Sequence, residues 1–141
     1  MNIYFACSIT GGREFEPVFQ AIVNAMQADG HHVPTTHLAE ASVREAELVV
    51  APDEVYQRDV DWIRAADVLV AETSTPSHGV GYEIGFALRL GKPVLVCHHS
   101  DKGISKMISG NPDPNLVIRQ YLDADGAIRV VRAFLSNIDL P

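Results

Sequence analysis

The stretch ADVLVAETSTPSHGVGYEIGFALRL, residues 66–90, decides how the rest of the sequence is interpreted. Residues 68–70 form a short apolar run, which is typical of a buried strand. Residues 73–79 are rich in Ser, Thr, Pro and Gly, as loops are. Residues 82–88 carry apolar side chains at helical spacing, so the order is strand, loop, helix. In open α/β sheets, ligands bind beside loops that follow the carboxyl ends of strands.

The same alternation of strand and helix runs through the chain. Apolar runs predict strands at residues 3–7, 68–70, 94–97 and 116–118, and a weaker edge strand at 32–35. Helical spacing predicts helices at 13–29, 52–66, 82–88 and 125–137, and a short one at 104–108. Residues 48–50 fit a strand or a buried helix, and we expect a flexible segment over the ligand crevice. The pattern predicts one α/β domain over residues 1–141, a Rossmann-like or flavodoxin-like parallel sheet with helices on both faces.

Composition narrows the classes of function. The chain has 141 residues, 47% of them apolar, and a net charge of −7, which argues against general binding to nucleic acid or to anionic membranes. Cys7 and Cys97 give neither a disulfide framework nor zinc-ligand spacing, so we expect no metal and no cofactor. The sequence shows no signal peptide and no apolar run of membrane-spanning length. We therefore expect a cytoplasmic protein.

Glu83 is the first candidate for chemistry. It lies in the first turn of the helix predicted at 82–88, where the positive end of the helix dipole favours an ionised carboxylate. An ionised Glu83 that faces the crevice is a candidate nucleophile, although a Glu there can also serve only to complement the dipole. Asp59, or alternatively Asp61, is a candidate partner, because glycosidic bonds are usually cleaved by paired carboxylates. A solvated helix residue is the plainer interpretation of Asp59.

A second candidate feature is the turn at residues 8–12, which carries a Gly-Gly pair before a helix. Such a turn lets backbone amides approach an anion of phosphate size, but a plain tight turn fits equally well. The turn is neither a dinucleotide fingerprint nor a P-loop, because it lacks the glycine spacing of the first and the Lys of the second. Ser77 adds a hydroxyl in the loop that we expect to lie beside this turn.

Four segments together resemble a known family. They are YFACSITGGRE at 4–14, DVDW at 59–62, ADVLVAE at 66–72 and PSHGVGYEIG at 76–85. In this order they resemble the 2'-deoxynucleoside 5'-monophosphate N-glycosidases of the nucleoside deoxyribosyltransferase superfamily. The similarity covers nearly the whole chain, and residues 79–85 are its most specific part.

The resemblance implies a role for each matching residue. Glu83 would attack the anomeric carbon, Tyr4 would orient that carboxylate, and Asp59 would act on the sugar hydroxyl or protonate the leaving base. Ser8 and Ser77 would bind the 5'-phosphate together with backbone amides of the turn formed by Ile9, Thr10, Gly11 and Gly12, and Gly79 would also lie at the substrate. In the family a further phosphate-binding serine comes from the neighbouring subunit of a homodimer, and Ser105 matches it.

Two positions bear on the substrate. The family usually has Arg where this chain has Thr10, and the loss of a guanidinium removes a bidentate phosphate contact. The related transferases, which use unphosphorylated nucleosides, carry an Asp at the position of Ser77 and tend to end in an aromatic residue, whereas this chain ends in residues 139–141, Asp-Leu-Pro. A Ser can donate a hydrogen bond to phosphate where an Asp would repel it, and we give Ser77 the greater weight.

The resemblance therefore implies an enzyme that hydrolyses 2'-deoxynucleoside 5'-monophosphates to free base and deoxyribose 5-phosphate, with retention of configuration. The first alternative is a nucleoside deoxyribosyltransferase, in which a second base replaces water. The second is a nucleotide-binding protein without turnover.

Overall fold

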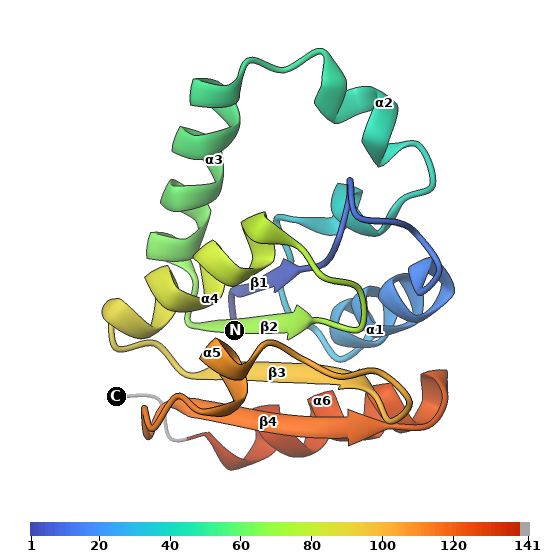
Figure 1. Ribbon diagram of the computed structural model, residues 1–141, viewed down its shortest axis with the longest axis vertical. Helices are drawn as coiled ribbons and strands as arrows, with labels where there is room; N and C mark the ends of the chain where they lie inside the picture. The colour runs from blue at the N-terminus through green and yellow to red at the C-terminus, as the bar shows by residue number, and fades with distance from the viewer. Residues whose placement is uncertain (139–141) are drawn as a thin grey trace.

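A computed structural model describes residues 1–138 of the chain and shows one parallel sheet (Figure 1). Its strands are β1 (Ile3–Ala6), β2 (Val68–Glu72), β3 (Val94–His99) and β4 (Leu116–Tyr121). They lie in the order β1-β2-β3-β4, and every neighbouring pair is parallel. All carboxyl ends therefore meet at one edge of the sheet. Residues 139–141, which the sequence analysis includes in the domain, lie outside the described residues.

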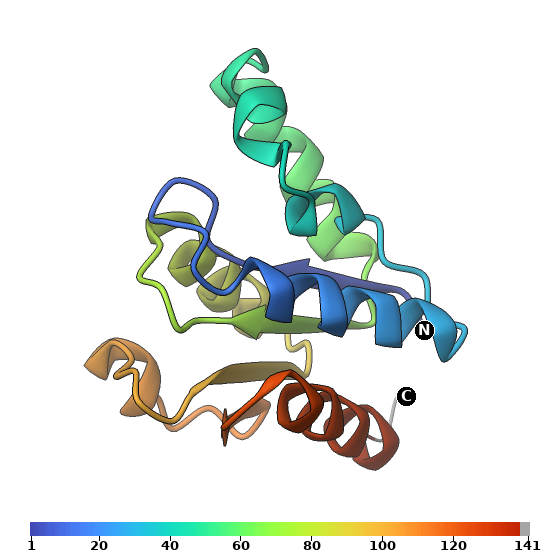
Figure 2. The same ribbon diagram turned by 90° about the vertical axis from the view of Figure 1, so that its right-hand side faces the viewer.

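Helices cover both faces of the sheet, which confirms the predicted fold class. They are α1 (Glu16–Ala28), a 3-10 helix η1 (Thr36–Ala39), α2 (Val43–Leu48), α3 (Pro52–Ala65), α4 (His78–Arg89), α5 (Lys106–Ser109) and α6 (Ala124–Asn137). α1 and α6 lie side by side on one face (Figure 2). α3 and α4 pack on the other face. Among residues 1–138, no helix is long and apolar enough to cross a bilayer.

Side chains of each strand alternate between the two faces, as a strand with a period of two requires. On β1, Ile3 and Phe5 pack with α1, whereas Tyr4 points to the face of α3 and α4. All three side chains are fully buried. Tyr4 is thus the one polar side chain on this strand, and its direction brings it beneath α4.

The prediction of a strand at residues 32–35 is wrong. Only an isolated bridge joins Asn2 to His32, and the chain then turns into η1. Pro34 has no N–H to give to a sheet ladder. The free edge of β1 is satisfied in another way, because the N–H of Ile3 donates to the His32 carbonyl at 2.8 Å and the N–H of Phe5 donates to the Thr35 hydroxyl at 2.9 Å.

Residues 48–50 form neither a strand nor a buried helix, but the expectation of a segment over the crevice is supported, because Val50 lines a cavity described below. Leu48 ends α2, and Leu48 and Val49 are 75% and 85% exposed. The side chain by which this short helix reaches the core is Val43, at its first residue. From α2 the chain passes into α3, and the two helices form an arch on the β1 side of the sheet (Figure 1).

Candidate active site

A cavity of about 410 Å³ lies beside β1, between the arch of α2 and α3 and the start of α4. It brings together six of the residues predicted from sequence: Ile9, Thr10, Asp59, Ser77, Gly79 and Glu83. Apolar side chains of residues 38–55 form the opposite wall. A carboxylate pair, a loop of small residues and an apolar wall therefore share one space, which we call the Glu83 cavity.

Glu83 reaches this cavity from the second turn of α4 and not from its first. The hydroxyl of Ser77 accepts the N–H of Val80 and caps the helix, so α4 begins at His78 and Glu83 is its sixth residue. The dipole argument therefore fails, because the dipole acts within the first turn. Burial raises the pKa of Glu83 to about 7, opposite to the expected direction.

Tyr4 lies directly against Glu83. Its hydroxyl donates a hydrogen bond to Oε1 of Glu83 at 2.7 Å, which favours the ionised carboxylate and partly opposes the effect of burial on its pKa. Burial and the charge of Glu83 hold the pKa of Tyr4 far above its usual range, so the phenol keeps its proton. Tyr4 can therefore orient Glu83 throughout the neutral pH range.

Of the two candidate partners of Glu83, Asp59 lines the cavity and Asp61 does not. The charge of Asp59 raises the pKa of both Glu83 and Tyr4. Asp61, two residues further along α3, points away and pairs on the surface with Gln57 and Arg64. The structure thus separates the two alternatives that sequence alone left open.

The turn at residues 8–12 and the loop at 73–77 touch each other. A Cβ atom on Gly11 would lie 2.5 Å from the carbonyl oxygen of Pro76 and 2.9 Å from Oγ of Ser8, so this close approach needs glycine. Gly12 has a φ of +125°, which also favours glycine. The turn is therefore built for contact with its neighbour, and Gly11 and Gly12 do not line the Glu83 cavity.

Ser8, the first residue of this turn, is fully buried and does not line the cavity either. Its Oγ has no hydrogen-bond partner among residues 1–138. The guanidinium of Arg13 donates to the carbonyl oxygens of Ser8, Leu38 and Glu40, at 3.1, 2.9 and 2.8 Å. Arg13 thus fixes the backbone of the turn and does not replace the arginine missing at Thr10.

Comparison with known proteins now gives the family. A sequence profile of the nucleoside 2-deoxyribosyltransferase family matches residues 3–116. The chain belongs to this family. A Methanosarcina mazei relative with the provisional name 2'-deoxynucleoside 5'-phosphate N-hydrolase 1 is 34% identical over 97% of this chain and 85% of its own. The mouse 5-hydroxymethyl-dUMP N-hydrolase is 41% identical over 79% of this chain and 66% of its own.

A solved structure of the fold also matches. The Clostridium botulinum CMP N-glycosidase superposes with a TM-score of 0.72, at 17% identity, over 94% of this chain and 98% of its own. At this identity the match speaks for the fold alone. The resemblance stated from four sequence segments is thus confirmed at the level of family and fold.

Ser105, which the family resemblance places at the phosphate, lies outside the Glu83 cavity of its own chain. It lines a neighbouring cavity of about 520 Å³ that shares Ser77 and Val80 with the first. Its hydroxyl accepts the N–H of Met107 at 3.2 Å and so caps α5. Met107 is 85% exposed, whereas Ile108 is half-buried against the core.

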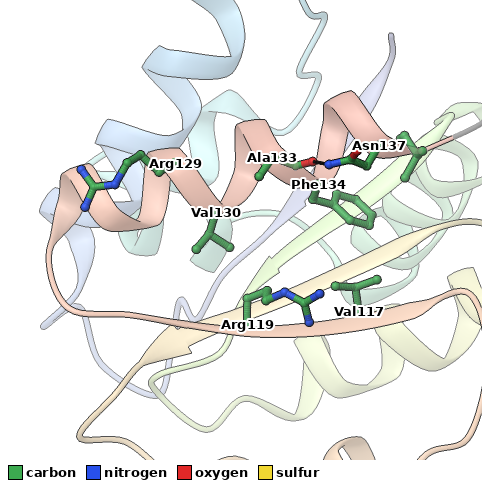
Figure 3. A pocket seen from close by; sticks show the side chains of 8 residues that line it. Val117, Arg119, Arg129, Val130, Ala133, Phe134 and Asn137 are labelled. Atoms are coloured by element: carbon green, nitrogen blue, oxygen red, sulfur yellow. Dashed lines mark hydrogen bonds between the residues drawn. The ribbon is translucent and has the colours of Figure 1, made fainter.

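A further cavity of about 370 Å³ lies on the far edge of the sheet, between β4 and α6 (Figure 3). Arg119 and Arg129 line it with apolar side chains, but the two guanidinium groups point away from each other. None of its lining residues is one that the family resemblance singles out. Within the described part of the chain, no three His, Cys, Asp or Glu side chains form a group able to hold a metal ion.

Sequence reasoning missed two residues of the Glu83 cavity region. Glu47 of α2 lines the cavity, and Arg58 of α3 binds both Glu47 and Asp59. An Arg directly before a candidate catalytic Asp is a visible signal. Adjacent residues of a helix do not normally face each other, however, so the spacing gave no reason to join them.

Proposed function

We propose that this chain hydrolyses the N-glycosidic bond of 2'-deoxynucleoside 5'-monophosphates. Two relatives with at least 34% identity carry N-hydrolase names. The observation that carries the proposal is the Tyr4–Glu83 pair at 2.7 Å, which opens on a cavity that also holds Asp59. A carboxylate with a pKa of about 7 is available both ionised and protonated near neutral pH.

The proposed reaction has two steps. Ionised Glu83 attacks the anomeric carbon, the bond to the base breaks, and the base leaves with its bonding electrons and gains a proton. Asp59 acts on the sugar hydroxyl or supplies that proton. Water then attacks the anomeric carbon of the glycosyl–Glu83 ester and gives up a proton, which replaces the one that the base took, so configuration is retained overall and Glu83 returns to its starting state. Tyr4 orients the carboxylate and stabilises its charge while it is the leaving group.

The 5'-phosphate is proposed to bind through hydroxyls and amides, since the described residues that line the cavity include no Lys or Arg. Ser77, Thr10 and the first residues of α4 near Gly79 surround one side of the cavity. The start of a helix supplies free N–H groups and a favourable dipole for an anion. Ser8 and the glycines of the turn act by shaping this loop and not by lining the cavity.

A substrate panel tests the proposal. Nucleoside monophosphates and the matching nucleosides are incubated with the protein, and the products are separated by chromatography. Because a hydrogen bond to a charged group contributes about 1.5–3 kcal/mol, we expect the nucleoside to react at least about tenfold more slowly than its monophosphate. Equal rates on the two would exclude the proposed phosphate recognition.

The transferase alternative has one observation in its favour, which is Thr10 at the position where the family usually has Arg. Adding a free acceptor base distinguishes the two reactions. A hydrolase forms deoxyribose 5-phosphate at a rate that the base leaves unchanged, whereas a transferase forms a new nucleotide or nucleoside. Loss of activity in a Glu83→Ala variant would exclude a binding protein without turnover, whereas a wild type that converts no member of the panel would favour it.

We also propose that the active unit is a homodimer in which Ser105 of one chain completes the site of the other. The exposed side chain of Met107 beside Ser105 supports an interface there. A second exposed apolar group lies on α3 and α4, where Tyr82 stacks on Phe86 and touches Tyr56. The cytoplasmic location likewise stays a prediction.

Mixing two inactive variants tests the shared site. In a mixed dimer of Glu83→Ala and Ser105→Ala, one site has Glu83 from one chain and Ser105 from the other if Ser105 acts across the interface. Activity should then return after subunit exchange. If Ser105 acts within its own chain, through the cavity that it shares with Ser77, the mixture stays inactive. A fully active monomer in light scattering would end the proposal.

A further inference from the structure

One guanidinium joins two separate walls of the Glu83 cavity. Nε of Arg58 donates to Oδ1 of Asp59 at 2.8 Å. Its terminal nitrogens donate to the two oxygens of Glu47 at 2.9 and 3.3 Å. The guanidinium also lies 5.0 Å above the ring of Trp62, one turn further along α3. The Trp62 ring thus contacts the face of the Arg58 guanidinium, and the carboxylates of Asp59 and Glu47 bind its N–H groups.

The two carboxylates that Arg58 holds both line the cavity, from different elements. Asp59 belongs to α3 and stands with Glu83 on the side where the sugar is proposed to react. Glu47 belongs to α2 and stands on the opposite wall, where the imidazole Nε2 of His37 also lies 3.1 Å from it. A forked guanidinium can bind two carboxylates at fixed angles, which an ammonium group cannot do.

We propose that Arg58 is a positioning residue that sets the direction of the Asp59 carboxylate and anchors the α2 wall to it through Glu47. The inference rests on the proposed function and adds a residue to it. Arg58 also matters electrostatically, because its positive charge lowers the pKa of Glu83 and of Tyr4, against the effect of Asp59. The groups that face Glu83 are Tyr4 from β1 and Asp59 and Arg58 from α3.

Two arginine variants separate position from charge. Arg58→Gln removes both, and we expect kcat/KM to fall about a hundredfold, with the acid limb of its pH profile shifted to higher pH. Arg58→Lys keeps a positive charge but cannot bind Asp59 and Glu47 together. It should return the acid limb towards its wild-type position while KM stays raised. If Arg58 only stabilised the fold, the acid limb would stay in place in Arg58→Gln, and Arg58→Lys would have no shift to reverse.

A glutamate pair on α2 supplies a matched control. Glu47→Gln removes one charge from the cavity wall, and Glu45→Gln removes the same charge from the exposed surface of the same helix. We expect Glu47→Gln to raise KM about tenfold, with kcat changed less than about twofold, because the wall and not the reacting centre is loosened. Glu45→Gln should match the wild type in both parameters.

The outcomes distinguish this inference from the proposed function. An active Glu83→Ala variant overturns the proposed mechanism through Glu83, whatever the Arg58 variants do. If Glu83→Ala is inactive while Arg58→Gln and Glu47→Gln keep wild-type KM, kcat and acid limb, only the role of Arg58 is wrong. Calorimetry adds a readout without turnover: in the Glu83→Ala background, Glu47→Gln should weaken binding of thymidine 5'-monophosphate about tenfold. Unchanged binding there would contradict the anchor. Thermal melts of each variant establish that it is folded.

Discussion

Two glutamates, the buried Glu72 and the partly buried Glu83, each accept a hydrogen bond from a tyrosine but have different surroundings. Glu83 accepts a hydrogen bond from Tyr4 at 2.7 Å, and Glu72 accepts one from Tyr121 at 2.8 Å. Burial raises the pKa of both carboxyl groups. A raised pKa and a tyrosine partner therefore do not by themselves mark a catalytic group.

What differs is the space around each carboxylate. Glu72 is 1% exposed, and Ser74 closes over it through its hydroxyl and its N–H, the latter at 3.2 Å. The same Ser74 hydroxyl accepts the N–H of His99 at 2.8 Å, so Glu72 ties the end of β2 to β3 and β4. Glu83 faces a cavity that also holds Asp59. The comparison supports the proposed catalytic role of Glu83, whereas the contacts of Glu72 suit the anchoring of a loop.

The largest expected effect is the loss of activity in Glu83→Gln. Without a nucleophile the covalent route is closed, so we expect turnover to fall by about three orders of magnitude or more, equivalent to roughly 4 kcal/mol in the barrier. The matched control is Glu72→Gln, the same substitution at the other buried carboxyl, which should keep most of the activity. If Glu83→Gln retains more than about a tenth of the rate, under ~1.4 kcal/mol, the distinction between the two glutamates fails.

A smaller effect is expected for Tyr4→Phe. This change removes the hydrogen bond that favours ionised Glu83, so the pKa of Glu83 should rise further and the acid limb of kcat/KM should move above its wild-type position near pH 7. At pH 7 we expect a loss of about tenfold, with partial recovery at higher pH. Tyr121→Phe, the corresponding change beside Glu72, should leave the limb in place. An unmoved limb in Tyr4→Phe would show that Tyr4 does not set the ionisation of Glu83.

The two regions also show what sequence could and could not predict. The alternation of apolar runs gave the four strands and the layers, because strand and helix periods are local properties. The start of α4 was missed, because Gly79 and Gly81 hide a helix whose cap is Ser77, and the error placed Glu83 in the wrong turn. The pKa of Glu83 is raised because other segments of the folded chain bury the carboxyl group, and a local sequence pattern does not reveal such burial.

Contacts between distant segments explain the remaining differences. Family resemblance pointed to Tyr4 and Glu83, which are 79 residues apart in sequence and share a hydrogen bond. It also pointed to Ser8 as a phosphate ligand, which stays a prediction; Ser8 is buried where the turn packs on Pro76, and its Oγ has no hydrogen-bond partner among residues 1–138. Arg58 was missed because its partner Glu47 lies on a helix of six residues, too short to read from periodicity.

The smallest expected effect is on stability, and it tests whether Glu72 is an anchor that keeps its proton. The pKa of Glu72 is raised in the folded state, so between the unfolded pKa of about 4.3 and the higher folded value the native chain holds a proton that the unfolded chain has lost. The stabilising contribution of Glu72 to the free energy of unfolding is therefore full at low pH, and it falls as pH rises through the folded pKa of Glu72. Glu72→Gln cannot titrate, so the difference in unfolding free energy between wild type and variant, measured with urea at pH 5 and pH 8, should shift in favour of the variant at the higher pH. The same comparison for Glu83→Gln measures the pH dependence that the raised pKa of Glu83 contributes. A difference that grows in favour of the wild type as pH rises would mean that Glu72 is ionised in the folded state and that Tyr121 and Ser74 stabilise its charge. The two glutamates would then differ in charge as well as in their access to a cavity.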